Sequence, residues 1–180
     1  MAVILDYAGS VFIGGMLLLL ILGFQATSAD AAATQNLTGI ALRNLSSTAE
    51  IIEYDFRKIG YRVSDTLKVV TIDSSSIVFK GDFDDNGVLD SIKYYTVLPV
   101  TRSNSEIKLY RRLNNGTPLM LSPDVNVFKL FAYDASCAPT TIGSKVRSIK
   151  ICLGITSAEE INGQYTSAYW ERTMKPNNLR

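Results

Sequence analysis

The 180-residue chain contains no histidine, and only 19% of its residues are charged. Histidine is the commonest metal ligand and the commonest acid–base group near neutral pH, so its absence removes the usual centre of a catalytic site. The formal net charge is +1 at pH 7, from 18 basic and 17 acidic residues. This balance gives no electrostatic reason to expect nucleic acid or an acidic substrate as a partner.

Motifs of the common enzyme classes are also missing. The sequence shows no nucleophile elbow, no phosphate-binding loop and no Cys-x-x-Cys pair. It shows no internal repeat and no low-complexity tract beyond a short alanine-rich stretch. We therefore predict that the chain is not an enzyme.

What the sequence does contain is a pattern for one long helix over residues 2–60. Its first part, MAVILDYAGSVFIGGMLLLLILGF, has no Lys or Arg and one charged side chain, that of Asp6. The apolar stretch over residues 8–24 is close to the minimum that crosses a bilayer. The following junction, QATSADAAATQ, contains no proline that would end the helix. Residues 1–30 are thus predicted to be a membrane-spanning helical segment.

A cleaved secretory signal and a buried core helix are the alternatives for this segment. A signal begins with a basic region, whereas this segment begins with an acidic one, although the run Ala29-Asp30-Ala31 could serve as a cleavage site. A helix on a small domain could not bury a segment that is apolar on all sides. We favour a retained membrane segment.

Residues 31–60 are predicted to be an amphipathic continuation of the helix. Apolar residues recur three or four positions apart in one stripe: Leu37, Ala41, Leu45, Ala49 (or Thr48), Ile52, Phe56 and Ile59. The polar residues that lie mostly between them are expected on the solvated side: Arg43, Asn44, Glu50, Glu53, Asp55 and Arg57. Gly60 is predicted to cap the helix.

Residues 61–180 are predicted to form a β-rich globular domain. Alternating, β-rich runs indicate strands at residues 67–73, 76–81, 91–100, 106–113, 125–133, 146–155 and 165–174. Strands that follow one another at short intervals imply an antiparallel sheet, and the amphipathic half of the helix is its expected cover. The predicted fold class is α+β, with a long N-terminal helix packed on an antiparallel sheet.

A family resemblance follows from the order of these segments. The long helix is followed by EYDFRKIGYRV, IVFKGDFDDNGVLDSIKYYTV, IKLYRRLNNGTPLMLSPDVNVFKLFAYD, VRSIKICLGI and YWERTMKPNNL. This order resembles the minor pilins of type IV pili and the J-type minor pseudopilins of type II secretion. The resemblance implies a structural filament subunit that assembles by packing of its N-terminal helix.

The resemblance also implies a role for Asp6. Members of the family begin with a short basic leader ending in Gly, then a Phe- or Met-led helix with Glu at the fifth mature position; neither feature is evident here. If Met1 is removed, which the small Ala2 allows, Asp6 becomes the fifth residue. Its implied role is assembly, by pairing with the amino terminus of a neighbouring subunit. The alternative is that Asp6 merely lies at the headgroup boundary of the membrane.

The strongest chemical motif lies between the second and third predicted strands. Oxygen ligands for a hard cation are offered at relative positions 1, 3, 5, 7 and 9, with Gly87 at position 6 for the bend: Asp82, Asp84, Asn86, the carbonyl of Val88, and Asp90. Position 12 is Lys93, so a bidentate Glu is missing, and Asp85 or water would have to complete the site. Calcium is the candidate cofactor. The alternative is a plain hairpin turn at Asn86-Gly87.

Cys137 and Cys152 are the only cysteines. In an exported domain, two cysteines suggest one disulfide, so we predict that they are bonded. The alternative is a pair of free thiols.

These observations predict a minor pilin or pseudopilin of a type IV pilus-like or type II secretion filament. Its expected partners are other such subunits and, before assembly, the inner membrane, with the β-rich domain in the periplasm. After assembly the subunit would lie in a cell-surface or periplasmic filament. The alternative function is a single-pass, membrane-anchored periplasmic binding, accessory or adhesive module, calcium-dependent or not, that never polymerises.

Overall fold

The computed structural model describes residues 2–64, 67–98, 107–161 and 163–179, and it has the predicted α+β class. A 56-residue helix, α1 (Ala2–Arg57), is followed by a seven-stranded antiparallel sheet in which every strand pairs with the next in the chain. The elements of the sheet, with a short 3-10 helix η1, are β1 (Val69–Ile72), β2 (Ser76–Gly81), β3 (Asp90–Val97), β4 (Ile107–Leu113), β5 (Leu119–Tyr133), η1 (Gly143–Lys145), β6 (Ser148–Ile161) and β7 (Gln164–Met174).

Each predicted strand is present, but several ends differ. β5 begins at Leu119 instead of residue 125, before Pro123, and β6 continues to Ile161. The register between β4 and β5 shifts between the pairs Ile107↔Val125 and Leu109↔Ser122, so Pro123 lies at an irregularity where no regular ladder bond is needed. Residues 99–106, which contain the ends of two predicted strands, lie outside the described residues.

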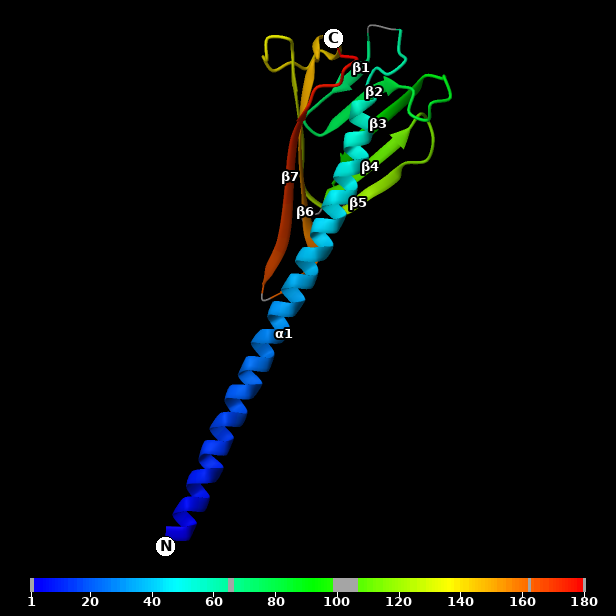
Figure 1. The fold of residues 1–180 in the computed structure, drawn as a ribbon. Coiled ribbons are helices and arrows are strands. Elements are labelled where there is room, and N and C mark those ends of the chain that lie inside the picture. Colours follow the sequence, from blue (N-terminus) through cyan, green and yellow to red (C-terminus); the bar gives the residue numbers. More distant parts are fainter. Residues whose placement is uncertain (1, 65–66, 99–106, 162, 180) are drawn as a thin grey trace.

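The helix has two halves with different surroundings. Residues 7–36 are exposed throughout and extend away from the sheet, whereas the C-terminal half of α1 lies along it, chiefly against β6 and β7 (Figure 1). At the usual rise of about 1.5 Å per residue, the exposed part is about 45 Å long. The amino end of the helix and the carboxyl end of the chain lie at opposite ends of the molecule (Figure 1).

The apolar stripe of the helix packs into the core, as predicted. Ile52, Phe56 and Ile59 are fully buried. The Phe56 ring lies 5.0 Å from that of Phe79 on β2 and 5.6 Å from that of Tyr94 on β3, measured between ring centroids. This aromatic contact joins the last turns of α1 to the centre of the sheet.

One polar residue of the helix, Asp55, faces the opposite side of the helix from the side that was predicted. Asp55 was expected on the solvated face, but it is 1% exposed and faces the sheet. Its carboxylate accepts hydrogen bonds from the Tyr94 hydroxyl at 2.5 Å and from Arg111 Nε at 2.6 Å. The helical period places Asp55 beside Phe56 at the edge of the stripe, and the two donors on the sheet make its burial possible.

The helix ends at Arg57, three residues before Gly60, which was predicted to cap it. After Arg57 the chain makes tight turns, and Gly60 has a φ of +73°, a conformation that favours glycine. The Gly60 amide donates to the Lys80 carbonyl at 2.8 Å, which fastens this turn to the end of β2. The connection between β2 and β3 therefore lies directly beside the end of α1.

Candidate functional site

The exposed half of α1 is the first candidate for a functional surface. Within the described part of the chain, α1 is the one helix that is long and apolar enough to cross a membrane, and none of its most apolar window is buried inside the molecule. Length and composition are thus compatible with a single-pass membrane anchor. The backbone of Asp6 belongs to α1, but its side chain lies outside the described part of the structure, so its predicted assembly role stays a prediction.

The acidic motif forms the second candidate. β2 and β3 are a hairpin, with Gly81 paired to Asp90, and residues 82–89 form the loop between them. The hairpin turn considered as the alternative is thus present, as an eight-residue loop around Asn86-Gly87 in which Asp85 and Gly87 have positive φ, +60° and +82°. Whether the loop also holds calcium stays a prediction.

Three of the predicted ligands lie together in this loop. One carboxylate oxygen from each of Asp82, Asp84 and Asp90 lies within 4.8 Å of the other two. Asp82 and Asp90 are buried, and Asp84 is exposed. Asn86 is bonded to Asp84 through Nδ2 at 2.7 Å, and its own Oδ1 accepts from the Val88 amide at 2.6 Å. The fold thus brings the three carboxylates of the motif into one compact group.

Residues from two other segments hold this loop, and the sequence motif did not point to them. Lys58, just after α1, donates to the Phe83 carbonyl at 3.0 Å and to Asp85 Oδ2 at 2.8 Å. Arg62 Nη1 donates to Asp82 Oδ2 at 2.9 Å. Asn114, in the turn between β4 and β5, donates to Asp90 Oδ1 at 2.8 Å. Such partners come from distant parts of the chain, so no local spacing could have revealed them.

The pKa of Asp82 reflects these contacts. Burial alone would raise the pKa of its carboxyl, but the hydrogen bonds from Arg62 and from the Gly87 amide outweigh that effect and hold the pKa below its ordinary value. Asp82 is therefore ionised at neutral pH although it is almost completely buried. An ionised, buried carboxylate is a suitable ligand for a cation.

Asp85, considered as a completion of the ligand set, and Lys93, which stands where a bidentate Glu is missing, are both engaged elsewhere. Lys93, at position 12, lies on β3 with its ammonium 5.1 Å from the centroid of the Tyr95 ring. Asp85 forms an ion pair with Lys58 and is not part of the group of clustered carboxylates. Of the two completions considered, water remains for any open coordination positions.

The predicted disulfide is not formed: both cysteines are free, Cys137 exposed and Cys152 buried. Cys137 lies in the turn after β5, where its amide donates to the Asp134 carbonyl at 3.1 Å. Cys152 lies within β6, four residues beyond Ser148, which pairs with the last residue of β5. Four strand residues span about 13 Å, whereas a disulfide needs Cα atoms within about 7 Å. The sheet register therefore keeps the two thiols apart.

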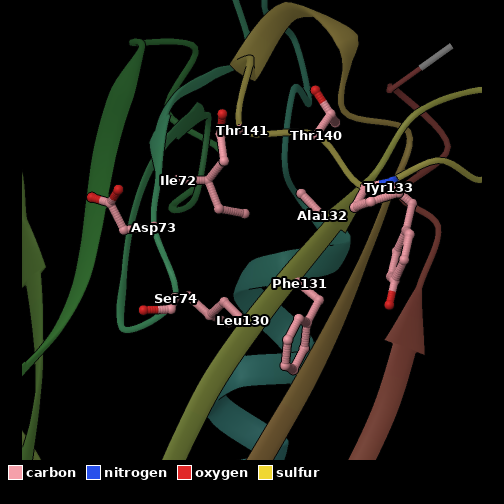
Figure 2. Close-up of a pocket in the computed structure, with 10 residues that line it drawn as sticks. Ile72, Asp73, Ser74, Leu130, Phe131, Ala132, Tyr133, Thr140 and Thr141 are labelled. Atoms are coloured by element: carbon pink, nitrogen blue, oxygen red, sulfur yellow. The ribbon is translucent and has the colours of Figure 1, made fainter.

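A cavity of about 370 Å³ lies beside the ends of β1 and β5 (Figure 2). Its lining combines apolar side chains with hydroxyl groups, and its one carboxylate, that of Asp73, points away from Ile72 (Figure 2). No lysine, arginine or cysteine lines it.

The comparisons with known proteins add no name to these features: the chain matches no protein-family model, and no curated protein matches it. The architecture itself is one long apolar N-terminal helix on an antiparallel sheet. That architecture is consistent with the pilin-like shape that the sequence resemblance implies.

Proposed function

We propose that the chain is a structural subunit of a filament, a minor pilin or pseudopilin of the type IV pilus or type II secretion kind, which assembles by packing of α1. The observation that carries this proposal is the continuous helix whose residues 7–36 are exposed throughout. An apolar surface of this size requires an environment other than water. Lipid supplies it before assembly, and the helices of neighbouring subunits supply it afterwards.

The length of the exposed helix favours a filament over a simple anchor. A single crossing of the hydrocarbon core needs about 30 Å of helix, or about 20 residues. The exposed part is about 45 Å long by the usual helical rise. Its last portion, residues 25–36, is a continuous, exposed helix that is rich in alanine and not apolar enough to require lipid. Small residues of this kind permit close approach of another helix.

The proposal places the chain in the inner membrane with its β-rich domain in the periplasm, and later in a cell-surface or periplasmic filament. Its partners are other pilin or pseudopilin subunits. Packing between the helices of neighbouring subunits covers residues 7–36 of α1, which are exposed in the single chain. No reaction is part of this function, and the chain acts as a building element.

Site-specific photocrosslinking in the producing cells tests this proposal. A photoreactive amino acid at Ala29, on the exposed helix, should crosslink to other filament subunits. The matched control is the same group at Asn115, which is exposed in the turn between β4 and β5. Filaments sheared from the cells, or isolated from the periplasm, are then identified by electron microscopy and mass spectrometry.

We expect the chain and its Ala29 crosslinks in the filament fraction, with fewer crosslinks from Asn115. A chain that stays wholly in the membrane fraction, with no crosslink from Ala29 to a filament subunit, would contradict the proposal. That result would favour the alternative, a membrane-anchored binding, accessory or adhesive module that does not polymerise.

A further inference from the structure

We propose that the loop over residues 82–90 binds one Ca²⁺ ion and that this ion fastens the end of α1 to the sheet. The ligands are the side chains of Asp82, Asp84, Asn86 and Asp90 and the carbonyl of Val88. This site does not depend on filament assembly, because every proposed ligand lies within residues 82–90 of a single chain.

The first support is the spacing of the oxygen atoms. Ligand oxygens lie about 2.4 Å from a calcium ion, so two ligands on opposite sides of the ion are about 4.8 Å apart. One carboxylate oxygen from each of Asp82, Asp84 and Asp90 lies within 4.8 Å of the other two. This spacing is close to what one ion held between the three carboxylates requires.

The second support is independent of the clustering. Asp82 is 1% exposed, and its Oδ1 atom is buried with no hydrogen-bond donor among the described residues. The other oxygen, Oδ2, already accepts from Arg62 Nη1 at 2.9 Å and from the Gly87 amide at 3.0 Å. A buried carboxylate oxygen without a partner is costly, since it has lost water and gained nothing in exchange. A cation in the loop supplies the missing partner.

The charged groups close to the loop carry an excess of negative charge that a divalent cation would neutralise. Four carboxylates gather there, those of Asp82, Asp84, Asp85 and Asp90, and two cations contact them, Arg62 at Asp82 and Lys58 at Asp85. Four negative and two positive charges leave a net charge of two negative units. One calcium ion neutralises this excess, which otherwise would push the ends of the loop apart.

The contacts of the loop explain what the ion does. The Asp82 amide donates to the Tyr61 carbonyl at 3.1 Å, and Lys58 donates to the Phe83 carbonyl at 3.0 Å. The Phe83 ring lies 5.7 Å from that of Phe79 in the core. Because one end of the loop is bonded to residues 58–62, an ion that orders the loop also orders the turn at the end of α1.

Calcium fits this loop better than magnesium. Magnesium requires a tight octahedron and gives up its water reluctantly, whereas calcium accepts six to eight oxygens in a flexible arrangement. The loop offers five protein ligands of mixed type and no bidentate Glu. We therefore expect weak binding, with a Kd of about 10⁻⁴ to 10⁻³ M, in the range of extracellular calcium modules.

The test is a calcium titration of the full chain in detergent by isothermal titration calorimetry, after removal of divalent ions. Asp84→Asn removes one ligand charge at an exposed position, so the variant should fold. Asp85→Asn is the matched control, since it removes the same charge from the adjacent residue. The Asp85 carboxylate accepts a hydrogen bond from Lys58 and is not one of the proposed ligands. Hydrogen exchange at residues 58–62 and 82–90, with and without calcium, reports the effect on the helix end.

We expect one calcium ion per chain, at least about tenfold weaker binding in Asp84→Asn, and a change of no more than about threefold in Asp85→Asn. Magnesium at equal concentration should bind more weakly, and calcium should slow exchange in both segments of the wild-type chain. Absence of calcium binding at 10 mM, or equal losses in the two variants, would overturn the site. Binding without slower exchange at residues 58–62 would overturn the link to α1.

Discussion

Asp55 shows how a single residue ties the helix to the sheet. Its carboxylate is buried and is bonded by the Tyr94 hydroxyl and by Arg111, which donates from Nε at 2.6 Å and from Nη2 at 3.2 Å. Burial and the neighbouring Asp55 carboxylate raise the pKa of Tyr94 well above its ordinary value, so this hydroxyl stays a donor. Three side chains from α1, β3 and β4 thus satisfy one another in the core.

Replacement of Asp55 should strongly destabilise the fold. Asp55→Ala leaves the Arg111 guanidinium and the Tyr94 hydroxyl without their acceptor, and loss of one partner of such a buried pair costs about 3–5 kcal/mol. Denaturant unfolding of the full chain in detergent, followed by circular dichroism, measures this loss. The control is Glu50→Ala, an exposed residue on the same helix, which should cost less than about 0.5 kcal/mol. Equal effects of the two variants would contradict the role of Asp55.

Asp6 is the residue at which filament assembly can be separated from membrane insertion. Asp6→Ala should leave the chain in the membrane fraction but exclude it from filaments, because a neighbouring amino terminus loses its counter-charge in an apolar environment. Asp6→Glu keeps the carboxylate and should restore incorporation. Cell fractionation with quantitative mass spectrometry of the filaments gives the result. Normal incorporation of Asp6→Ala would show that Asp6 only marks the membrane boundary.

At the scale of elements, the end of α1 and the end of β2 lie in direct contact. Gly81 is a point of close approach, because a Cβ atom added there would lie 2.5 Å from the Lys58 carbonyl oxygen. The Gly60 amide and the Lys80 carbonyl are hydrogen-bonded across the same junction at 2.8 Å. Backbone therefore packs against backbone, with no flexible side chain between the two elements that could move aside.

Gly81→Ala should consequently weaken this junction. The added methyl group must push β2 away from the turn after α1, and overpacking of this kind costs about 1–3 kcal/mol. Thermal unfolding of the full chain in detergent provides the measurement. Gly39→Ala is the control, since nothing lies within 4 Å of a Cβ at that helical position. Alanine at position 39 should be neutral or stabilise the helix by up to about 1 kcal/mol. A Gly81→Ala variant as stable as the wild-type chain would refute the close contact at Gly81.

At the scale of the whole molecule, the chain divides into a folded head and an exposed helix. The sheet and the C-terminal half of α1 form one core, and the remaining part of α1 extends away from it (Figure 1). Residues 7–36 are exposed, so they add nothing to that core. The stability of the head and the membrane or filament contacts of the helix are therefore separate properties of one chain.

Removal of residues 1–30 should leave the head folded. The truncated chain starts at Ala31, ahead of the buried stripe, and its unfolding free energy should stay within about 1 kcal/mol, or roughly 2–4 °C in midpoint. It should also be soluble without detergent, because the exposed apolar segment is gone. Differential scanning calorimetry and gel filtration check both expectations. An aggregated or unfolded product would mean that the first 30 residues support the fold.

The sequence alone predicted the elements and their neighbours in this protein. The apolar stripe of α1, the positions of the strands and the antiparallel α+β class all follow from local periods of 3.6 and 2 residues, which side-chain geometry imposes on any helix or strand. The acidic loop was also visible, because its ligand spacing lies within one short segment of chain. Consecutive strands joined by short connections then pair with their neighbours.

Only the tertiary structure decided which polar groups are buried and which distant residues meet. Local spacing put Asp55 on the solvated side of the helix, but Tyr94 and Arg111 make its burial possible. The register of β5 and β6, which keeps Cys137 and Cys152 apart, depends on pairings along whole strands. In the same way Lys58 and Arg62 reach the acidic loop from the end of the helix. Such contacts depend on packing between remote segments, and local sequence patterns carry no information about that packing.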